Sequence, residues 1–528
     1  MKWTLRRDRD ARGAPGQAMN IVAGVDFGTG GVRVTIADAA DGALGSASAP
    51  LAVRTNPADP LEATQRHADH LIALERAFAD ALRRSGVDGR SVGALAIATT
   101  GSTVLPIDAH FQPIGDYYLW SDHRAWREAA EITAAAQAAA LPAIRFCGGR
   151  YSAEWGWAKL LHWLRHNPGL RDRFHTAVEH CDYIVATLCG IAELDALPRS
   201  ICAMGHKWLW NAELGGFPPE DFLASVDPLL AGMRGRMAGR YQTSNMIAGG
   251  LCGEWASRLG IAEGIPVPTG ALDAHWDAIG SGCRRGDIVN VVGTSSCIMA
   301  LSDAADPVDG IPGVVPGSIH PAFAGIEAGL ASVGETFAAI AARADRPLDT
   351  LMAETGAYKA GQTGLVRLLW DNGDRSVLMN PALGGITMGW RNHHVPADEL
   401  FAAMEGAAFQ TRIIAERLGA HGVPLDRIIN GGGIPQRNIL LNQIYANVLG
   451  VPVLVPRFGV TGLGSAMFAM VVAGAVDSIE TAQAALCTDY QVVEPDTEAV
   501  RQYEVGFEEF RHFYFSLPSM LARARPQG

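Results

Sequence analysis

Two short stretches of the sequence place polar groups on turns that have almost no bulky side chains. In residues 21–34 an apolar run reaches Asp26-Phe27-Gly28-Thr29-Gly30-Gly31 and then continues as a second apolar run. Residues 288–299 repeat this pattern around Gly293-Thr294-Ser295-Ser296. Each pattern predicts a β-hairpin whose tip offers backbone N–H groups and hydroxyls, which can bind phosphoryl oxygens. A carboxylate at a strand end, as predicted for Asp26, can also hold hydrated Mg²⁺.

A third glycine-rich stretch, Gly431-Gly432-Gly433, lies between a short apolar strand at 427–429 and a helical segment from Gln436. Because these residues have no side chains, a phosphate or a flat ring can approach the backbone at the helix N-terminus. Each stretch alone also fits an ordinary turn. In the first one, Asp26 would merely cap its own loop. The first stretch is not a P-loop, which needs Gly-Lys-Ser/Thr, and it does not have the spacing of a dinucleotide fingerprint. The three together, in this order, are harder to explain as turns.

The hydrophobic periodicity around these stretches predicts alternating strands and helices. Residues 63–85 have apolar positions at helical spacing, and 92–98 reads as a buried strand that ends in Thr99-Thr100-Gly101-Ser102-Thr103. Further helical patterns lie at 125–140, 155–166, 330–343, 400–418, 436–449 and 463–473. Because both hairpins open a similar series, we expect two related α/β domains, at 20–283 and 284–528. We expect residues 1–19 to be a disordered extension, with Met19 as an alternative start.

The composition is that of a packed enzyme. The 528 residues are 48% apolar and 19% charged, with a formal net charge of −12, which argues against nucleic acid or an anionic membrane as the main partner. The eight cysteines have no C-x-x-C spacing, so we expect buried thiols rather than a zinc site or a disulfide framework. No apolar run has membrane-spanning length and the N-terminal tail has no secretory apolar core. We therefore expect a cytoplasmic protein.

The order of the three stretches resembles the actin/hexokinase/Hsp70 ATPase superfamily, and within it the FGGY carbohydrate kinases, ribulokinase branch. The resemblance runs from about Asn20 to about Leu517. It rests on these segments: Gly24-Val25-Asp26-Phe27-Gly28-Thr29, Thr99-Thr100-Gly101-Ser102-Thr103, Leu119-Trp120-Ser121-Asp122-His123, Tyr151-Ser152-Ala153-Glu154-Trp155, Ala203-Met204-Gly205-His206-Lys207, Gly270-Ala271-Leu272-Asp273-Ala274-His275 and Gly325-Ile326-Glu327-Ala328-Gly329. It implies two RNase H-like domains with an interdomain cleft, the first binding a sugar and the second a nucleotide.

The resemblance also assigns roles within the expected site. Asp273 is the expected general base, which takes the proton from a sugar hydroxyl as the γ-phosphoryl group of ATP moves in line. On the sequence alone Asp277 and His275 are rivals; we interpret Asp277 as a helix surface charge and His275 as a satisfied, partly buried side chain. Lys207 and Glu327 are expected to bind the ketose. A carboxylate in the apolar surroundings of Glu327 also needs a ligand or a buried partner.

The remaining expected site residues follow from the same motifs. Backbone at Gly101 is expected to approach the sugar, with Thr100 and Ser102 beside it. Asp26 is the expected Mg²⁺ residue. The expected ATP-binding residues are Gly28, Thr29, Gly30, Gly293, Thr294, Ser295, Gly432, Gly433 and Asn438.

Two segments depart from the family pattern. The last motif, Phe458–Ala466, has an uncharged lead and Ser465 where an alanine is usual, and the segment 350–392 is shorter than in typical ribulokinases. The expected activity is phosphorylation of ribulose, in the L- or the D-form, and relatives of this kind are often homodimers. The alternatives are a kinase for xylulose, ribitol or glycerol, a non-phosphorylating ATPase, and a catalytically silent sugar-binding regulator.

Overall fold

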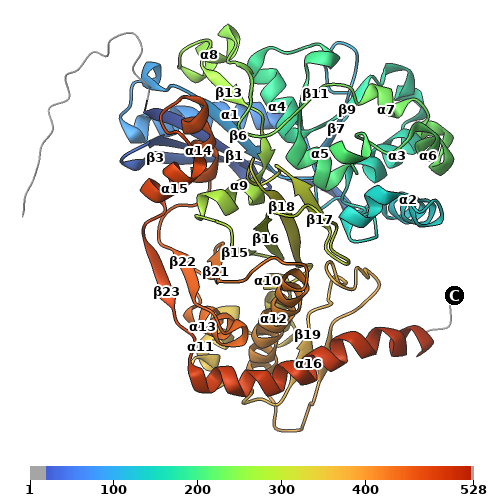
Figure 1. The fold of residues 1–528 in the computed structure, drawn as a ribbon, viewed down its shortest axis with the longest axis vertical. Helices are drawn as coiled ribbons and strands as arrows, with labels where there is room; N and C mark the ends of the chain where they lie inside the picture. Colours follow the sequence, from blue (N-terminus) through green and yellow to red (C-terminus); the bar gives the residue numbers. More distant parts are fainter. Residues whose placement is uncertain (1–19, 525–528) are drawn as a thin grey trace, which may run out of the picture.

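The computed structural model describes residues 20–524, so the expected extension at 1–19 lies outside the described residues. The chain builds two large sheets, one above the other in Figure 1, with helices around them. No helix within residues 20–524 combines the length and the apolar character needed to cross a membrane. All eight cysteines are free, and each is buried or partly buried.

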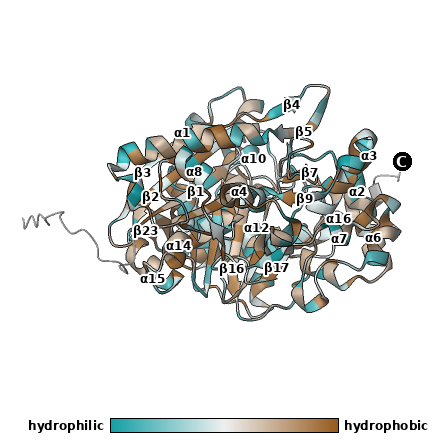
Figure 2. Cartoon of the chain, turned by 90° about the horizontal axis from the view of Figure 1, so that it is seen from above, coloured by the Kyte–Doolittle hydropathy of each residue, from teal (hydrophilic) through white to brown (hydrophobic). Residues whose placement is uncertain are grey.

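The first large sheet is built by residues 21–272 and has the strand order β14-β6-β1-β2-β3. Its strands are β1 (Ile21–Gly28), β2 (Gly31–Asp38), β3 (Gly42–Pro50), β6 (Leu95–Thr99) and β14 (Ala271–Leu272). β1 and β2 form the predicted hairpin, in which Asp26 faces Arg33 across the ladder. β6 runs parallel to β1 on its other side. Helix α1 (His67–Ser85) packs on β2 and β3 through one apolar face, and its turns alternate between brown and teal in Figure 2.

The second large sheet repeats this plan. Its strand order is β17-β18-β16-β15-β21-β22-β23. The strands are β15 (Asp287–Val292), β16 (Ser296–Ser302), β17 (Gly313–Pro316), β18 (Ala324–Leu330), β21 (Arg427–Gly431), β22 (Val453–Pro456) and β23 (Tyr490–Val493). In both sheets a central strand pairs antiparallel with its hairpin partner and parallel with a later strand. This duplication confirms the prediction of two RNase H-like domains. We call residues 20–280 the N-terminal half and residues 287–524 the C-terminal half.

Smaller strands and helices complete each half. A third sheet has the order β4-β5-β8-β7-β9, from β4 (Arg54–Asn56), β5 (Asp59–Gln65), β7 (Val104–Ile107), β8 (Tyr117–Tyr118) and β9 (Thr176–Glu179). The remaining strands pair as β10 (Pro198–Ser200) with β11 (Arg240–Gln242), β12 (Ile247–Gly250) with β13 (Pro266–Pro268), and β19 (Val366–Leu368) with β20 (Ile386–Met388). The helices of the N-terminal half are α2 (Trp126–Ala138), α3 (Gly156–His166), α4 (His180–Cys189), α5 (Ile201–Lys207), α6 (Glu220–Val226), α7 (Met233–Arg236), α8 (Gly253–Leu259) and α9 (Asp273–Gly280).

The helices of the C-terminal half are α10 (Gly334–Arg343), α11 (Leu348–Thr355), α12 (Pro396–Gly419), α13 (Ile439–Leu449), α14 (Leu463–Val472), α15 (Ile479–Leu486) and α16 (Thr497–Ala524). Helix α12 contacts β18, β19 and α13. Helix α14 instead crosses to the other half and packs on β1, β6 and α9 (Figure 1). There Trp276 stacks on Phe468, with ring centroids 4.5 Å apart. One hydrophobic core therefore joins the two halves.

The last motif brings α14 into close contact with β1 and α9. A Cβ at Gly24 would lie 2.2 Å from the carbonyl oxygen of Gly462, and one at Gly464 would lie 1.8 Å from that of Trp276. Ser465, which replaces the usual alanine, donates a hydrogen bond of 3.1 Å to the carbonyl of Val25 in β1. The glycines of this motif therefore permit helix-to-strand contact, and the serine adds a polar link to the strand that carries Asp26.

Candidate active site

Three carboxylates gather where β1 approaches the start of α9. Asp26 lies in β1, and Asp273 begins α9 directly after β14, which is two strands from β1 in the sheet. Asp277 follows one helical turn later. Burial and the charges of Asp277 and Asp273 raise the pKa of Asp26 well above its ordinary value. Burial and Asp273 raise the pKa of Asp277 to about 8. Our interpretation of Asp277 as a surface charge is therefore wrong, because the residue is partly buried and repels its two neighbours.

The residues of this cluster fit a divalent cation. Asp26 Oδ1 is buried and has no hydrogen-bond partner within residues 20–524. Arg33 lowers the pKa of Asp26, but burial and the two neighbouring carboxylates outweigh it. Mg²⁺ prefers oxygen ligands and few protein carboxylates, so Asp26 can hold it in the manner predicted. One oxygen of Asp273 accepts the backbone N–H of Ala274 at 2.7 Å, which orients its carboxylate.

A buried ion pair connects the two halves beside these carboxylates. Lys207, the last residue of α5, donates from Nζ to both oxygens of Glu327 in β18, at 2.7 and 2.9 Å. The buried partner expected for Glu327 is thus Lys207 itself. Both side chains contribute to the electrostatic environment of Asp273, whose pKa burial raises. The pair therefore lies next to the expected base.

Histidines extend this ion pair into a chain. His275 Nε2 lies 3.0 Å from Glu327 Oε2, and His275 Nδ1 lies 2.9 Å from the sulfur of Cys202. Burial alone would lower the pKa of His275, but Cys202 and Glu327 raise it to about 9. The interpretation of His275 as a satisfied side chain agrees with these contacts, and the residue is fully rather than partly buried.

The charge of Glu327 is compensated by this chain. Burial alone would raise the pKa of Glu327, but Lys207 and His275 hold it well below its ordinary value. His206, His275 and Glu327 each offer a ligand atom within 4.8 Å of the others. Because the Lys207 ammonium already contacts both carboxylate oxygens, this group is built as an ion-pair network rather than as a metal site.

The loop expected to approach the sugar is fixed from behind by two buried charges. Ser102 donates from its hydroxyl to Glu179 at 2.6 Å, and Glu179 also accepts the indole N–H of Trp208 at 2.7 Å. Lys159 Nζ donates to the carbonyls of Ser102 and Leu119 at 2.8 and 2.6 Å. The proton of the Ser102 hydroxyl is thus already donated within the protein.

The backbone of this loop lies against the residue before the expected base. Thr100 pairs its hydroxyl with that of Thr103 at 2.9 Å. A Cβ at Gly101 would lie 2.1 Å from the side chain of Leu272, which directly precedes Asp273. Gly101 therefore lies against the residue that directly precedes the expected base. Sequence reasoning missed Glu179 and Lys159, because only burial distinguishes them from ordinary surface charges.

The first hairpin tip is held by side chains from other segments. Thr29 Oγ1 accepts the indole N–H of Trp120 at 2.9 Å, and the Thr29 carbonyl accepts from Gln65 at 2.8 Å. Since the hydroxyl accepts here, its own proton is free to be donated to a ligand. Gly28 is partly exposed and Gly30 is exposed. Trp120 belongs to the segment Leu119–His123, whose pattern does not predict the contact with Thr29.

The second hairpin tip is tied to the start of α10. Thr294 is exposed, and its carbonyl accepts the N–H groups of Val333 and Glu335 at 2.9 and 3.1 Å. The Gly293 carbonyl accepts from Gly334 at 3.1 Å, and Ser295 is partly exposed. Thr294 is therefore an exposed residue on a tip whose backbone is held by hydrogen bonds.

The glycine-rich turn after β21 packs on the end of β15. Gly432 has φ +90°, and a Cβ there would lie 2.4 Å from the carbonyl oxygen of Val292, so this position requires glycine. Gly433 is exposed. Asn438 caps α13, because its side-chain oxygen accepts the N–H of Leu441 at 2.9 Å. The structure thus gives Gly432 and Asn438 definite roles in packing and capping.

A second ion pair spans the two halves. Arg375, in the segment 350–392, contacts Glu154 at 3.2 Å, and Glu154 directly precedes Trp155. The charge of Glu154 raises the pKa of the Arg375 guanidinium, whereas burial lowers it. The effect of Glu154 is larger, so the pKa lies above its ordinary value. The Lys207 ammonium lies 5.8 Å from the Trp155 ring centroid. The pairs Lys207–Glu327 and Arg375–Glu154 therefore lie around one region.

Comparison with known proteins matches this architecture. The N-terminal domain model of the FGGY family of carbohydrate kinases matches residues 21–280, and the C-terminal domain model matches residues 288–473. The chain belongs to the FGGY family of carbohydrate kinases. It is therefore a sugar kinase with ATP as phosphate donor.

Several ribulokinases align along nearly the whole chain. Ribulokinase of Shouchella clausii is 32% identical over 93% of this chain and 94% of its own length. Ribulokinase of Mycolicibacterium smegmatis is 32% identical, with 89% of each protein covered. Among solved structures, a xylulose kinase from Brucella ovis superposes with a TM-score of 0.83 at 20% identity, covering 95% of this chain and all of the other. That likeness shows the fold.

Proposed function

We propose that this FGGY kinase transfers the γ-phosphoryl group of ATP to the terminal hydroxyl of ribulose. The observation that carries the proposal is the buried Lys207–Glu327 pair beside Asp273, which combines a donor and an acceptor for sugar oxygens with a base. The names and the coverage of the ribulokinase relatives support the choice of a ketopentose. Residues 20–283 would bind the sugar and residues 284–528 the nucleotide.

Asp273 would accept the proton of the attacking hydroxyl. Its raised pKa increases its basicity, while Lys207 and His275 keep the ionised form accessible by opposing that rise. The pair Lys207–Glu327 would orient the sugar with Gly101 at the other side. Closure of the two halves around the substrates would exclude water that otherwise accepts the phosphoryl group.

The two hairpin tips would hold the phosphates from opposite halves. The first tip would use Thr29 with Gly28 and Gly30. The second would use Thr294 with Gly293 and Ser295. Gly433 would lie beside the adenosine, while Gly432 and Asn438 shape that turn. Asp26 would hold Mg²⁺, which when bound neutralises charge on the β- and γ-phosphates. Its orphaned oxygen supports this role.

A coupled assay of ADP release over L-ribulose, D-ribulose, xylulose, ribitol and glycerol tests the proposal. We expect the highest kcat/KM for one of the ribuloses. A highest value for xylulose would favour a xylulose kinase instead. The likeness to solved xylulose kinase structures supports only the shared fold. ATP consumption that does not depend on any of these sugars would contradict both.

The substitution Asp273→Asn tests the assigned base. We expect kcat to fall by about 10²–10⁴, the usual contribution of a positioned general base. Binding of ATP, measured by titration calorimetry, should change little, because Asp273 is assigned to the sugar hydroxyl. Near-native turnover at saturating sugar would show that another group takes the proton, and Asp277→Asn is the matched variant one turn away.

A further inference from the structure

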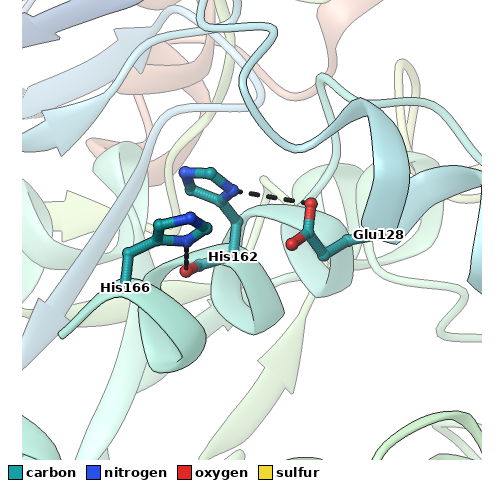
Figure 3. A group of neighbouring side chains, drawn as sticks. All are labelled: Glu128, His162 and His166. Atoms are coloured by element: carbon teal, nitrogen blue, oxygen red, sulfur yellow. Dashed lines mark hydrogen bonds and ion pairs between the residues drawn. The ribbon is translucent and has the colours of Figure 1, made fainter. Parts of the chain in front are cut away.

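A group of nitrogen and oxygen ligands lies outside the candidate active site, between α2 and α3. Glu128 projects from α2, and His162 and His166 project from successive turns of α3 (Figure 3). One ligand atom of each residue lies within 4.8 Å of the other two. Histidines four residues apart on one helix share a face, so both rings can reach the same point.

The hydrogen bonds of the two histidines leave the required nitrogen atoms available. His166 Nδ1 lies 2.8 Å from the carbonyl oxygen of His162, so Nδ1 carries the proton and Nε2 keeps its lone pair. This is the usual arrangement of a metal-ligating histidine, whose second nitrogen donates to a carbonyl or carboxylate. His162 is 8% exposed, and its Nδ1 is buried without a hydrogen-bond partner among the residues described.

The distance between His162 and Glu128 fits two ligands of one ion. His162 Nδ1 lies 3.5 Å from Glu128 Oε2, which is longer than a hydrogen bond. Two ligands at zinc bond lengths in a tetrahedron lie about 3.4 Å apart. The exposed His166 ring stacks on His162 at 4.0 Å between centroids. Because His166 is a surface side chain, we expect it to turn when an ion binds, which would bring its nitrogen closer to the other two ligand atoms.

The local charge also favours a cation. Arg165 pairs with Glu128, Glu131 and Asp227, at 3.3, 2.6 and 2.7 Å. A single guanidinium thus serves three carboxylates, which leaves an excess of two negative charges while the histidines are neutral. Arg165 contacts Oε1 of Glu128, whereas Oε2 faces His162. The guanidinium therefore orients the carboxylate and leaves one oxygen for a metal ion.

We propose that Glu128, His162 and His166 bind one divalent transition-metal ion of the Zn²⁺ type, with water as the fourth ligand. Two imidazoles and one carboxylate suit Zn²⁺ and its neighbours, whereas Mg²⁺ prefers oxygen ligands alone. The ion would connect α2 to α3 and so stabilise the helical layer of the N-terminal half. This site is separate from the Mg²⁺ expected at Asp26.

Calorimetric titration of the chelator-treated full-length protein with Zn²⁺, in excess Mg²⁺ to occupy the active-site carboxylates, tests the proposal. We expect one Zn²⁺ per chain and a melting temperature that rises on its addition. His166→Ala should weaken binding at least about 100-fold, since outer partners of a metal alone account for about 10–100-fold. Glu128→Gln should weaken it as well.

The exposed His110 provides the matched control, and His110→Ala should bind Zn²⁺ as the unmodified protein does. His166 is exposed, so its variant should keep the fold, which circular dichroism checks, and the kinase activity. Absence of Zn²⁺ binding by the unmodified protein would overturn the proposal. So would binding of unchanged affinity in both His162→Ala and His166→Ala, which would place the ion elsewhere.

Discussion

At the scale of single residues, the charged groups of the site stabilise one another in a chain. Lys207 contacts Glu327, Glu327 contacts His275, and His275 contacts Cys202. A buried charge without a partner costs several kcal/mol, so each member depends on the next. The chain also crosses from α5 and α9 in one half to β18 in the other.

Replacing Lys207 should therefore destabilise the protein through the charge left behind. We expect Lys207→Met to lower the free energy of unfolding by about 3–5 kcal/mol, the usual cost of breaking a buried pair. Urea denaturation followed by tryptophan fluorescence measures it. The double variant Lys207→Met/Glu327→Leu should lose less than the single one, and a double variant that loses more would refute this explanation.

His275 should make stability depend on pH. Its pKa is about 9 in the folded chain and about 6.5 in the unfolded one, so its stabilising contribution is complete below pH 6.5 and is lost as pH rises through 9. The contribution is on the order of 3 kcal/mol. His275→Gln does not titrate, so its unfolding free energy should change less between pH 6.5 and 9. If the unfolding free energies of the unmodified protein and His275→Gln changed with pH in the same way, a charged His275 would be contradicted.

At the scale of elements, α14 depends on glycines that allow it to touch β1 and α9. These glycines lie in the last motif, residues 458–466. Gly464 lies where a Cβ would overlap the carbonyl oxygen of Trp276. The helix thereby supports both the strand of Asp26 and the helix of Asp273.

The substitution Gly464→Ala should force α14 away from α9. Overpacking of this kind costs about 1–3 kcal/mol and should also reduce kcat, because Asp26 and Asp273 move with these elements. Gly419, in the last turn of α12, provides the control, since a Cβ there meets nothing within 4 Å. Gly419→Ala should be neutral or stabilising. Thermal unfolding and turnover of both variants test this. Equal effects of the two substitutions would show that close packing at Gly464 is not the cause.

At the scale of the whole molecule, the two halves meet through ion pairs as well as through the shared core. Arg375 contacts Glu154, and it lies in the segment 350–392, which from the sequence we expect to be shorter than in typical ribulokinases. The guanidinium also stabilises the ionised form of Glu154. Burial alone would raise the pKa of this carboxyl, but Arg375 lowers it. This pair should favour the closed arrangement of the halves.

Breaking the pair should weaken sugar binding more than ATP binding. We expect Arg375→Gln to raise the KM for the sugar about 10-fold, equivalent to about 1.4 kcal/mol, with a smaller change for ATP. Steady-state kinetics with each substrate varied separately measure both values. Arg391, exposed in the C-terminal half, is the control, and Arg391→Gln should behave as the unmodified enzyme. Equal changes in both KM values would speak against a role for Arg375 at the sugar side.

The sequence by itself determined the duplicated hairpins, the α/β class and the family. Those features are local: short continuous apolar runs form buried strands, and the glycine-rich tips between them form turns. The sequence also pointed to Asp26, Lys207, Asp273 and Glu327. Only the tertiary structure decided how these groups pair, because a carboxylate acquires a shifted pKa from neighbours that lie far away in the chain. Asp277 is such a case, since its neighbour Asp26 lies at the other end of the same half.

Tertiary contacts also decided which polar residues are committed to the protein. Glu179 and Lys159 fix the loop of Gly101 from positions that have no motif, and Arg375 reaches Glu154 across the halves. Helix α14 belongs to the C-terminal half in sequence and to the sheet of the N-terminal half in space. The physical reason is common to these cases: long-range packing and the desolvation of charge depend on the assembled core, which no local pattern of residues encodes.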